Sequence, residues 1–217
     1  MYFDLDALGY GESYRLLVNT VVPRPIALVT TVDEDGVTNA APFSFFNIMG
    51  HDPPILVLGI ERRAPGEYKD TLANLRHGGE FIVNLVSEQI AGPMNICAVS
   101  FPREVDELAR AGLSSQPGER VRVPRILEAP ASLECTVRQL IALGEDRSLV
   151  IGNIHAMHLR DEFWDAERRY VRTAEMKLIA RMHGRGWYTR TSDLFHMARK
   201  TVDEFDQARP PGARRDD

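Results

Sequence analysis

The stretch PRPIALVTTVDEDGVTNAAPFSFFN, from Pro23 to Asn47, decides the fold of this chain. Residues 26–31 are aliphatic or β-branched, as strand residues usually are. Residues 33–36 (DEDG) have the composition of a tight turn between two strands. Residues 39–44 begin as a second strand, which we expect to break at Pro42 because proline has no N–H to donate to a sheet ladder. The stretch therefore predicts a β-hairpin.

The end of the second strand carries more polar and aromatic residues than a simple core segment needs. Ser44 and Asn47 follow the proline and flank Phe45 and Phe46. Polar groups placed among large apolar ones are typical of the wall of a small-molecule pocket. We therefore expect this segment to line a ligand site.

The remaining chain reads as a mixture of strands and short helices. Further strands are expected at 55–60, 80–86, 132–143, 149–159 and 177–182, the last of them being the final strand, and helices at 12–22, 69–77, 87–99, 103–111 and from Ser192 or Asp193 onward. This order predicts a mainly β protein. We expect one β-barrel-like domain at 1–206 with helical insertions and a C-terminal helix, followed by a disordered tail at 207–217.

Composition narrows the class of protein. The chain has 217 residues, 44% of them hydrophobic, and a net charge of −5, which offers no basic surface for nucleic acid. No apolar run reaches the roughly 18 residues of a membrane span. The first residues (MYFDLDALG) do not resemble a secretion signal, so a cytoplasmic protein without a membrane partner is expected. Cys97 and Cys135 are then expected to be free buried thiols rather than a disulfide.

The sequence Lys69-Asp70-Thr71 is the sharpest candidate for a binding function. It opens a predicted helix, and a helix N-terminus attracts phosphate through its unpaired N–H groups and partial positive charge. Lys69 adds a full positive charge and Thr71 a hydroxyl donor. The alternative interpretation is an ordinary capped helix with a solvated lysine.

A second polar set lies in the hairpin. Thr30 and Thr31 in the first strand, together with Ser44 and Asn47, have the hydrogen-bonding groups that a flavin's ribityl chain or pyrimidine edge requires, with Phe45 packed nearby. The alternative is that the threonines are ordinary strand residues and the phenylalanines belong to the core.

Other chemistries have little support in the sequence. His155 and His158 are three residues apart in a predicted strand, which puts them on opposite faces, and no metal site is expected. The fingerprints of phosphate-binding loops, dinucleotide-binding folds and hydrolytic nucleophiles are absent. No catalytic side chain is assigned.

Several motifs in a fixed order resemble the flavin reductase-like proteins of the FMN-binding split-barrel superfamily. They are N-x-A-P-F-S-x-F at 39–46, K-D-T-x-x-N at 69–74 and E-F-x-V-N-L at 80–85, followed by weaker matches at 105–108, 111–113, 128–130, 133–135 and 151–152. The resemblance runs from about Pro23 to Tyr188, which is most of the chain.

The resemblance implies a six-stranded Greek-key split barrel that forms a homodimer and binds FMN noncovalently near the dimer interface. By position, Lys69 and Thr71 would hold the phosphate, and Asp70 between them is counted with the cofactor-binding residues. The ribityl chain and ring would meet Thr30, Thr31, Ser44, Phe45 and Asn47, with Asn84 supporting the site and Arg181, Gly184 and Tyr188 approaching from the end of the barrel.

The resemblance also implies an activity: NADH or NADPH reduces bound flavin, which passes electrons to free flavin, a partner oxygenase or another acceptor. Many relatives read G-D-H before the strand that contains I-G, whereas this chain has Glu145-Asp146-Arg147. Two alternatives therefore stay open: a flavin-binding electron carrier without NAD(P)H activity, and a barrel that holds haem or a pyridoxal phosphate-like ligand instead.

Overall fold

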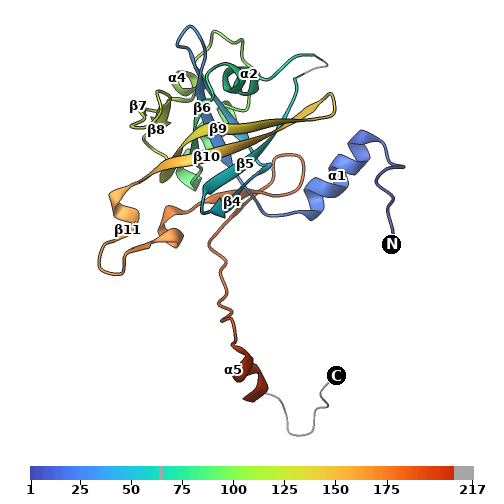
Figure 1. Cartoon of the computed structure of the whole chain (residues 1–217), viewed down its shortest axis with the longest axis vertical. Coiled ribbons are helices and arrows are strands. Elements are labelled where there is room, and N and C mark those ends of the chain that lie inside the picture. The colour runs from blue at the N-terminus through green and yellow to red at the C-terminus, as the bar shows by residue number, and fades with distance from the viewer. Residues whose placement is uncertain (64–65, 208–217) are drawn as a thin grey trace.

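The computed structural model describes residues 1–63 and 66–207 and is dominated by one antiparallel sheet (Figure 1). The sheet has seven strands in the order β3-β2-β6-β9-β10-β5-β4. They are β2 (Ala27–Val32), β3 (Thr38–Phe43), β4 (Phe46–His51), β5 (Pro54–Glu61), β6 (Glu80–Leu85), β9 (Ala131–Leu143) and β10 (Arg147–Leu159). The mainly β barrel expected from the sequence is confirmed, with seven strands in this sheet rather than six.

The chain between β3 and β4 forces the sheet to curl. These two strands are the opposite edges of the sheet, yet only Ser44 and Phe45 separate them in the sequence. A fully extended chain spans at most about 3.6 Å per residue, so the two edges must come close together. The Phe45 carbonyl then accepts a hydrogen bond of 2.7 Å from the Gly59 amide of β5. The result is a rolled sheet rather than an open one.

The interior of the barrel is filled by apolar side chains from most of its strands. Phe81 of β6 is fully buried at its centre, and Leu56, Leu58 and Ile60 line it from β5. Gly152 of β10 lies directly under the Phe81 ring, because a Cβ at this position would be 2.6 Å from the ring's Cζ. The glycine is therefore required by packing.

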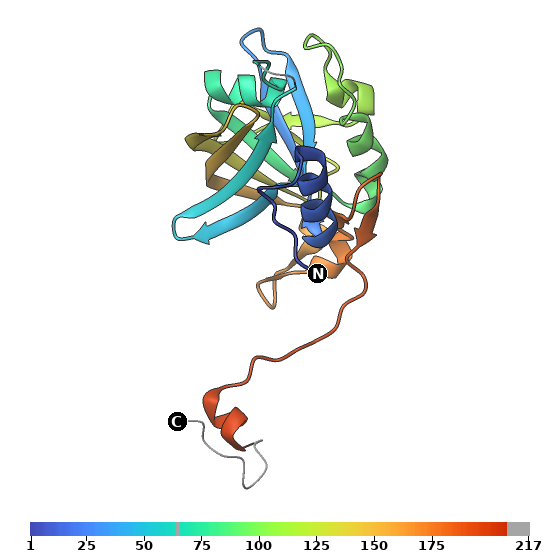
Figure 2. The same ribbon diagram turned by 90° about the vertical axis from the view of Figure 1, so that its right-hand side faces the viewer.

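Short helices and small sheets surround the barrel (Figure 2). The helices are α1 (Tyr10–Thr20), α2 (Asp70–His77), α3 (Ala91–Ile96), α4 (Glu107–Ala111), α5 (Val202–Gln207), and the 3-10 turns η1 (Glu88–Ile90), η2 (Asp161–Phe163) and η3 (Thr173–Met176). The remaining strands are β1 (Arg24–Pro25), β7 (Ser115–Pro117), β8 (Pro124–Ile126), β11 (Trp164–Asp165), β12 (Tyr170–Val171), β13 (Ile179–Arg181) and β14 (Tyr188–Arg190). None of the described helices is long and apolar enough to cross a membrane.

Arg24 ties α1 and the β1-β13-β14 sheet to the barrel. Its guanidinium donates to the carbonyls of Val18 (2.6 Å) and Val21 (2.8 Å) at the end of α1, and to Met182 just after β13 (2.9 Å). Arg24 is 9% exposed, so a single buried cation joins the end of α1 and β1 to the segment after β13, which lies 158 residues further along the chain.

Three expectations about local structure are wrong. The strand β3 does not break at Pro42 but continues to Phe43, which is tolerated because β3 is an edge strand. Lys177–Met182 contains only the short β13, and β14 follows it, so it is not the last strand. Residues 192–201 are not helical; α5 begins only at Val202, far from the barrel (Figure 1). The predicted tail at 207–217 lies, apart from Gln207, outside the described residues.

The two histidines of β10 also differ from expectation. A bulge between Ile154 and Ala156 breaks the two-residue alternation of the strand. His155 therefore bonds Thr136 (2.7 Å) and His158 bonds Glu134 (2.5 Å), two residues on the same face of β9. Their three-residue spacing does not place them on opposite faces.

Candidate functional site

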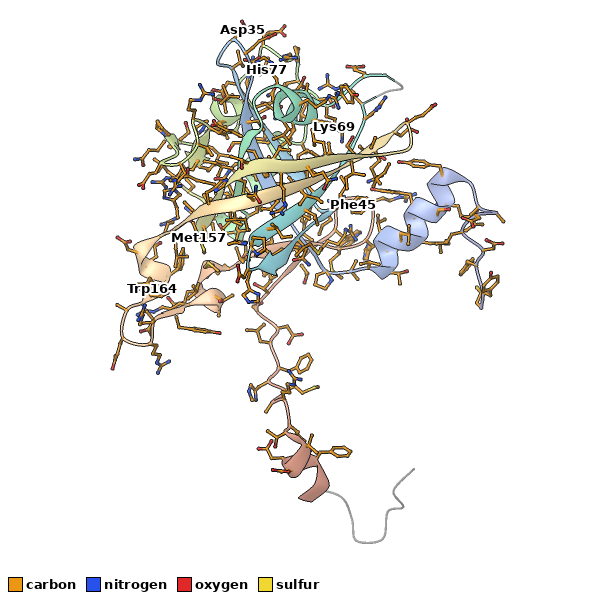
Figure 3. The ribbon with its side chains drawn as sticks, in the orientation of Figure 1. Asp35, Phe45, Lys69, His77, Met157 and Trp164 are labelled. Carbon is orange, nitrogen blue, oxygen red and sulfur yellow. The ribbon has the colours of Figure 1, made fainter. Side chains whose placement is uncertain are left out.

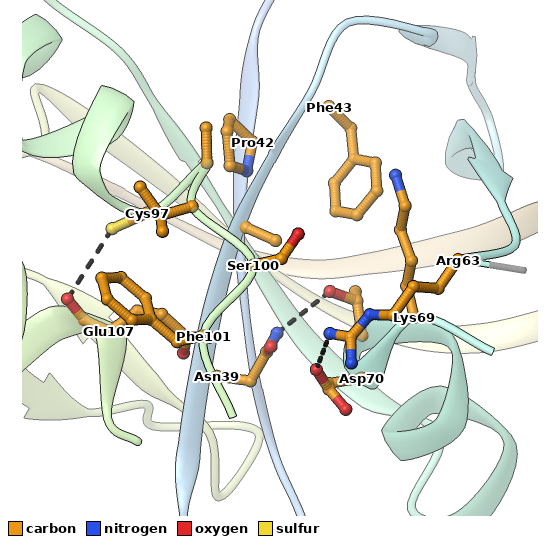
Figure 4. A pocket seen from close by; sticks show the side chains of 14 residues that line it. Asn39, Pro42, Phe43, Arg63, Lys69, Asp70, Cys97, Ser100, Phe101 and Glu107 are labelled. Carbon is orange, nitrogen blue, oxygen red and sulfur yellow. Dashed lines mark hydrogen bonds and ion pairs between the residues drawn. The ribbon is translucent and has the colours of Figure 1, made fainter. Parts of the chain in front are cut away.

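Two adjoining hollows form a groove along β3. They share Pro42, Phe43 and Ala98, and have volumes of about 140 Å³ and 300 Å³. The first opens at the start of α2, with Lys69 and Arg63 on one side and the segment around Cys97 and Phe101 on the other (Figure 4). The larger hollow reaches the lower end of the roughly 300–1,000 Å³ that is usual for a small-molecule site.

The start of α2 has the features of an anion site. Lys69 is the N-cap residue in an extended conformation, and no side chain caps the helix. Asp70, the first residue of α2, pairs with Arg63 at 2.7 Å, so its negative charge is compensated. The N-terminus thus keeps its partial positive charge beside the Lys69 ammonium, at the wall of the first hollow.

A buried set of hydrogen bonds connects α2 to the hairpin. The amide nitrogen of Asn39 donates to Thr71 Oγ1 at 3.0 Å and to Thr31 Oγ1 at 3.3 Å. Asn74 Nδ2 also donates to Thr31 Oγ1, at 3.0 Å. Asn39 and Thr71 line the first hollow, whereas Thr31 and Asn74 lie behind them. Thr31 therefore supports the groove without lining it.

Glu107 and Cys97 also line the first hollow, although neither was selected as a site residue from the sequence. Glu107 is 6% exposed and accepts a hydrogen bond of 3.0 Å from the Ala40 amide of the edge strand β3. Burial raises the pKa of Glu107, and the nearby Asp70 and Asp106 carboxylates add to this. Burial, together with Glu107, raises the pKa of the Cys97 thiol to about 12, so it is not a reactive thiolate near neutral pH.

Asn39 was also missed as a site residue, although the sequence contains a signal for it. It lies opposite Thr31 in the hairpin, so two polar residues face each other across the two strands. A hydrogen-bonded cross-strand pair at that register can be inferred from the turn alone. No comparable signal exists for Glu107, which is the first residue of a short helix and would ordinarily be exposed.

The second hollow brings together three of the residues expected at the site. Ser44, Arg181 and Tyr188 line it, with the Arg181 guanidinium 4.7 Å from the centre of the Tyr188 ring. The Ser44 hydroxyl accepts a bond of 3.4 Å from Arg24 Nε. This end of the groove thus combines an aromatic ring, a cation and a hydroxyl.

Two of the expected residues, Thr30 and Asn84, are absent from both hollows and are fully buried. Thr30 donates its hydroxyl to the Pro124 carbonyl at 2.7 Å. Asn84 donates to the Leu28 carbonyl and accepts from the Ile126 amide and the Ser132 hydroxyl, at 2.8–3.0 Å. The Thr30 hydroxyl therefore bonds the protein's own backbone rather than a ligand. Asn84 joins β2, β6 and β9 behind the groove.

Phe45, Asn47 and Gly184 lie outside both hollows as well. Phe45, at the corner between β3 and β4, is 36% exposed (Figure 3), and Asn47 is exposed on β4. Gly184 donates its amide to Asn19 Oδ1 at 3.0 Å, beside α1. The single chain therefore gathers Lys69, Asp70, Thr71, Ser44, Arg181 and Tyr188 along the groove, and leaves the other expected residues away from it.

Arg147, at the position where the family resemblance led us to expect a histidine, is engaged with its own neighbours. It pairs with Glu61 at 3.0 Å, and its guanidinium lies 4.9 Å from the centre of the Phe45 ring. The Tyr10 hydroxyl of α1 also bonds Glu61, and this bond raises the pKa of Tyr10.

Comparison with known proteins agrees with this fold. Residues 19–174 match the flavin reductase like domain family. An uncharacterised protein of Deinococcus radiodurans is 44% identical over 219 residues, covering 97% of this chain and 96% of its own.

Two solved structures superpose closely. The 2-nitrobenzoate 2-nitroreductase NbaA of Pseudomonas fluorescens is 36% identical, with a TM-score of 0.84 and coverage of 93% of this chain and 98% of NbaA. Component B of the nitrilotriacetate monooxygenase from Bacillus cereus is 29% identical, with a TM-score of 0.85 and coverage of 91% and 98%.

The fold and these similarities define a split-barrel protein of the flavin reductase-like class. This chain belongs to the flavin reductase like domain family, whose match covers most of its length.

Proposed function

We propose that this protein is an FMN-dependent oxidoreductase, with residues 1–206 acting as one FMN-binding domain. The observation that carries the proposal is the continuity of the groove. It leads from a helix N-terminus beside Lys69 to the aromatic and cationic end formed by Tyr188 and Arg181. Such a site has an anion-binding end and an aromatic end, which are the two chemical needs of a flavin mononucleotide.

The residues of the groove fit this cofactor. The Lys69 ammonium and the uncapped amides of α2 supply positive charge for a phosphate dianion, and the Arg63–Asp70 pair removes a competing negative charge. Phe43 and Pro42 form the apolar floor shared by both hollows. FMN, when bound, supplies the hydride chemistry, while the protein supplies position, apolar packing and hydrogen bonds.

The electron donor in this proposal is NADH or NADPH, and the acceptor is free flavin, a partner oxygenase or another small molecule. The names of two relatives support this range: one is a nitroreductase and the other is a component of a monooxygenase. We further propose a cytoplasmic homodimer with FMN near its interface. The exposed Ile48 and Met49 on the edge strand β4, at 55% and 58% exposure, give apolar surface for such an interface.

A second candidate function is electron transfer by bound FMN without NAD(P)H activity. It is favoured by Arg147, which takes the place of the family's usual histidine and is held by Glu61 and Phe45. A side chain held in this way is less available to a nicotinamide cofactor. This candidate shares the flavin site and differs only in the electron donor.

Two measurements test these proposals in order. Purified protein is mixed with FMN, freed of unbound ligand, and examined for a visible flavin absorbance band; a colourless protein would reject both candidates. Stopped-flow mixing of the FMN-loaded protein with NADH and with NADPH follows. Rapid bleaching supports the oxidoreductase, and stable colour with both donors supports the electron carrier.

A further inference from the structure

A set of buried hydrogen bonds behind the groove fixes the direction in which one hydroxyl donates; among the buried side-chain atoms of this set, within the described residues, only Asn74 Oδ1 has no partner. Thr31 Oγ1 has two lone pairs, and both are used, by Asn74 Nδ2 at 3.0 Å and Asn39 Nδ2 at 3.3 Å. The same Asn39 nitrogen donates to Thr71 Oγ1 at 3.0 Å. These three bonds connect α2 to β2, β2 to β3, and β3 back to α2.

The hydroxyl hydrogen of Thr71 remains available for donation to a ligand. Its hydroxyl accepts from Asn39, and within residues 1–63 and 66–207 no group accepts the Thr71 hydroxyl hydrogen. Thr71 is 1% exposed and lines the hollow next to Lys69. Because a hydroxyl has one donor, the Asn39 bond keeps that donor for a ligand in the hollow.

Asn39 is enclosed at the point where it makes these two bonds. It is 8% exposed, and it lies opposite Thr31 in the register of the hairpin. A carboxylate or a reversed amide at position 39 would accept the hydrogen of the Thr71 hydroxyl instead. The lone pairs of Thr71 Oγ1 would then face the ligand. An anion in the hollow would then be repelled, because its oxygen atoms and Thr71 Oγ1 would both be hydrogen-bond acceptors.

We propose that Asn39 is a positioning residue that makes Thr71 a hydrogen-bond donor to the phosphate of FMN. It thereby sets the preference of the site for the phosphorylated flavin over riboflavin. This inference rests on the proposed function, since it assigns the start of α2 to the flavin phosphate. Asn39 acts through Thr71.

The test compares the dissociation constants of FMN and riboflavin for the wild type and for N39L, T71V and the double variant. A hydrogen bond to a charged group is one of the stronger kinds, so T71V should weaken FMN by about tenfold or more. N39L frees the hydroxyl to rotate and should weaken FMN by about 3- to 10-fold. Riboflavin affinity should stay within about twofold in every variant, because riboflavin has no phosphate.

The double variant separates positioning from general support of the fold. If Asn39 acts only through Thr71, adding N39L to T71V should cause no further loss of FMN affinity. T71S, which keeps the hydroxyl, should remain close to the wild type. If N39L does not fold, the affinities of T71V and T71S for FMN and riboflavin still show whether the Thr71 hydroxyl binds the phosphate.

Three outcomes would overturn the inference. Equal loss of FMN and riboflavin in N39L would make Asn39 a structural residue only. Additive losses in the double variant would show that Asn39 does not act through Thr71. A wild type that binds neither flavin rejects the proposed function and this inference together, whereas the first two results leave the proposed function standing.

Discussion

Glu107 accepts a hydrogen bond of 3.0 Å from the backbone amide of Ala40, which joins α4 to the exposed edge of β3. The bond satisfies an amide that the sheet leaves unpaired, but it places a carboxyl group in a buried position. A buried carboxylate is disfavoured in its charged form, which gives the pair a pH dependence.

We expect E107Q to become more stable relative to the wild type as the pH rises. Burial, and then Asp70 and Asp106, raise the pKa of Glu107 above its usual value of 4.5. The Glu107 carboxyl group holds its proton more tightly in the folded than in the unfolded protein. Its contribution to the free energy of unfolding is therefore full below pH 4.5 and is lost as the pH rises through the raised pKa. Glutamine keeps an acceptor for Ala40 and does not ionise.

Thermal unfolding of both proteins between pH 4 and pH 8 measures this effect, with the exposed E104Q as the control. A difference in Tm between E107Q and wild type that does not vary with pH would contradict the prediction.

Glu134 should give the opposite pH dependence. Burial alone would raise its pKa, but the amides of Glu119, Arg120 and Val121, at 2.6–2.9 Å, and the His158 ring lower it to about 2. Its contribution to stability is therefore present above the usual 4.5 and is lost as the pH falls toward 2.

Replacing Glu134 by glutamine removes the charge from this cradle of donors. We expect E134Q to lower the free energy of unfolding at pH 7 by about 2 kcal/mol, because several N–H groups lose a charged acceptor. Urea unfolding at pH 7 and pH 3 should show a smaller difference at pH 3. The exposed E145Q serves as control, and a deficit that is equal at both pH values would refute the explanation.

Gly152 should tolerate no larger residue, since its added Cβ would lie 2.6 Å from Cζ of the buried Phe81. We expect G152A to destabilise the protein by about 1–3 kcal/mol, as overpacked cores do. Gly92 in α3 is the matched control: its added Cβ meets nothing within 4 Å, and alanine favours a helix. Denaturant unfolding compares the two, and equal stability of G152A and wild type would mean that the barrel interior can adjust.

Lys69 should contribute strongly to cofactor binding under the proposed function. We expect K69A to weaken FMN by more than about 1 kcal/mol, because charge-assisted contacts to phosphate are among the stronger ones. Fluorescence titration of FMN measures the change, and riboflavin should be affected much less. K200A, on the exposed segment before α5, is the control. Unchanged FMN affinity in K69A would leave Lys69 as a solvated helix residue.

Much of the barrel is predictable because its signals are local. The β2-β3 hairpin follows from alternation and a glycine-containing turn, and Gly36 does adopt a positive φ of 86°. The pairing of β9 with β10 follows from two long strands and one turn. The β4 strand could not be inferred, because it is completed only by pairing with β5 across the corner at Phe45.

The expected helix from Ser192 failed for a related reason. Its apolar residues have helical spacing, but residues 192–201 extend away from the barrel, with Leu194 and Phe195 70% and 85% exposed. An amphipathic pattern stabilises a helix mainly when its apolar face is packed, and in this chain the barrel does not cover that face.

The sequence alone determined the hairpin at Pro23–Asn47, the start of α2 at Lys69 and the order of the family's motifs, because each depends on neighbouring residues. Only the tertiary structure decided which of these residues meet. It brought Asn39, Thr71 and Glu107 to one hollow and turned Thr30 and Asn84 away from it, since strand pairing and the burial of polar groups are settled by contacts between distant parts of the chain.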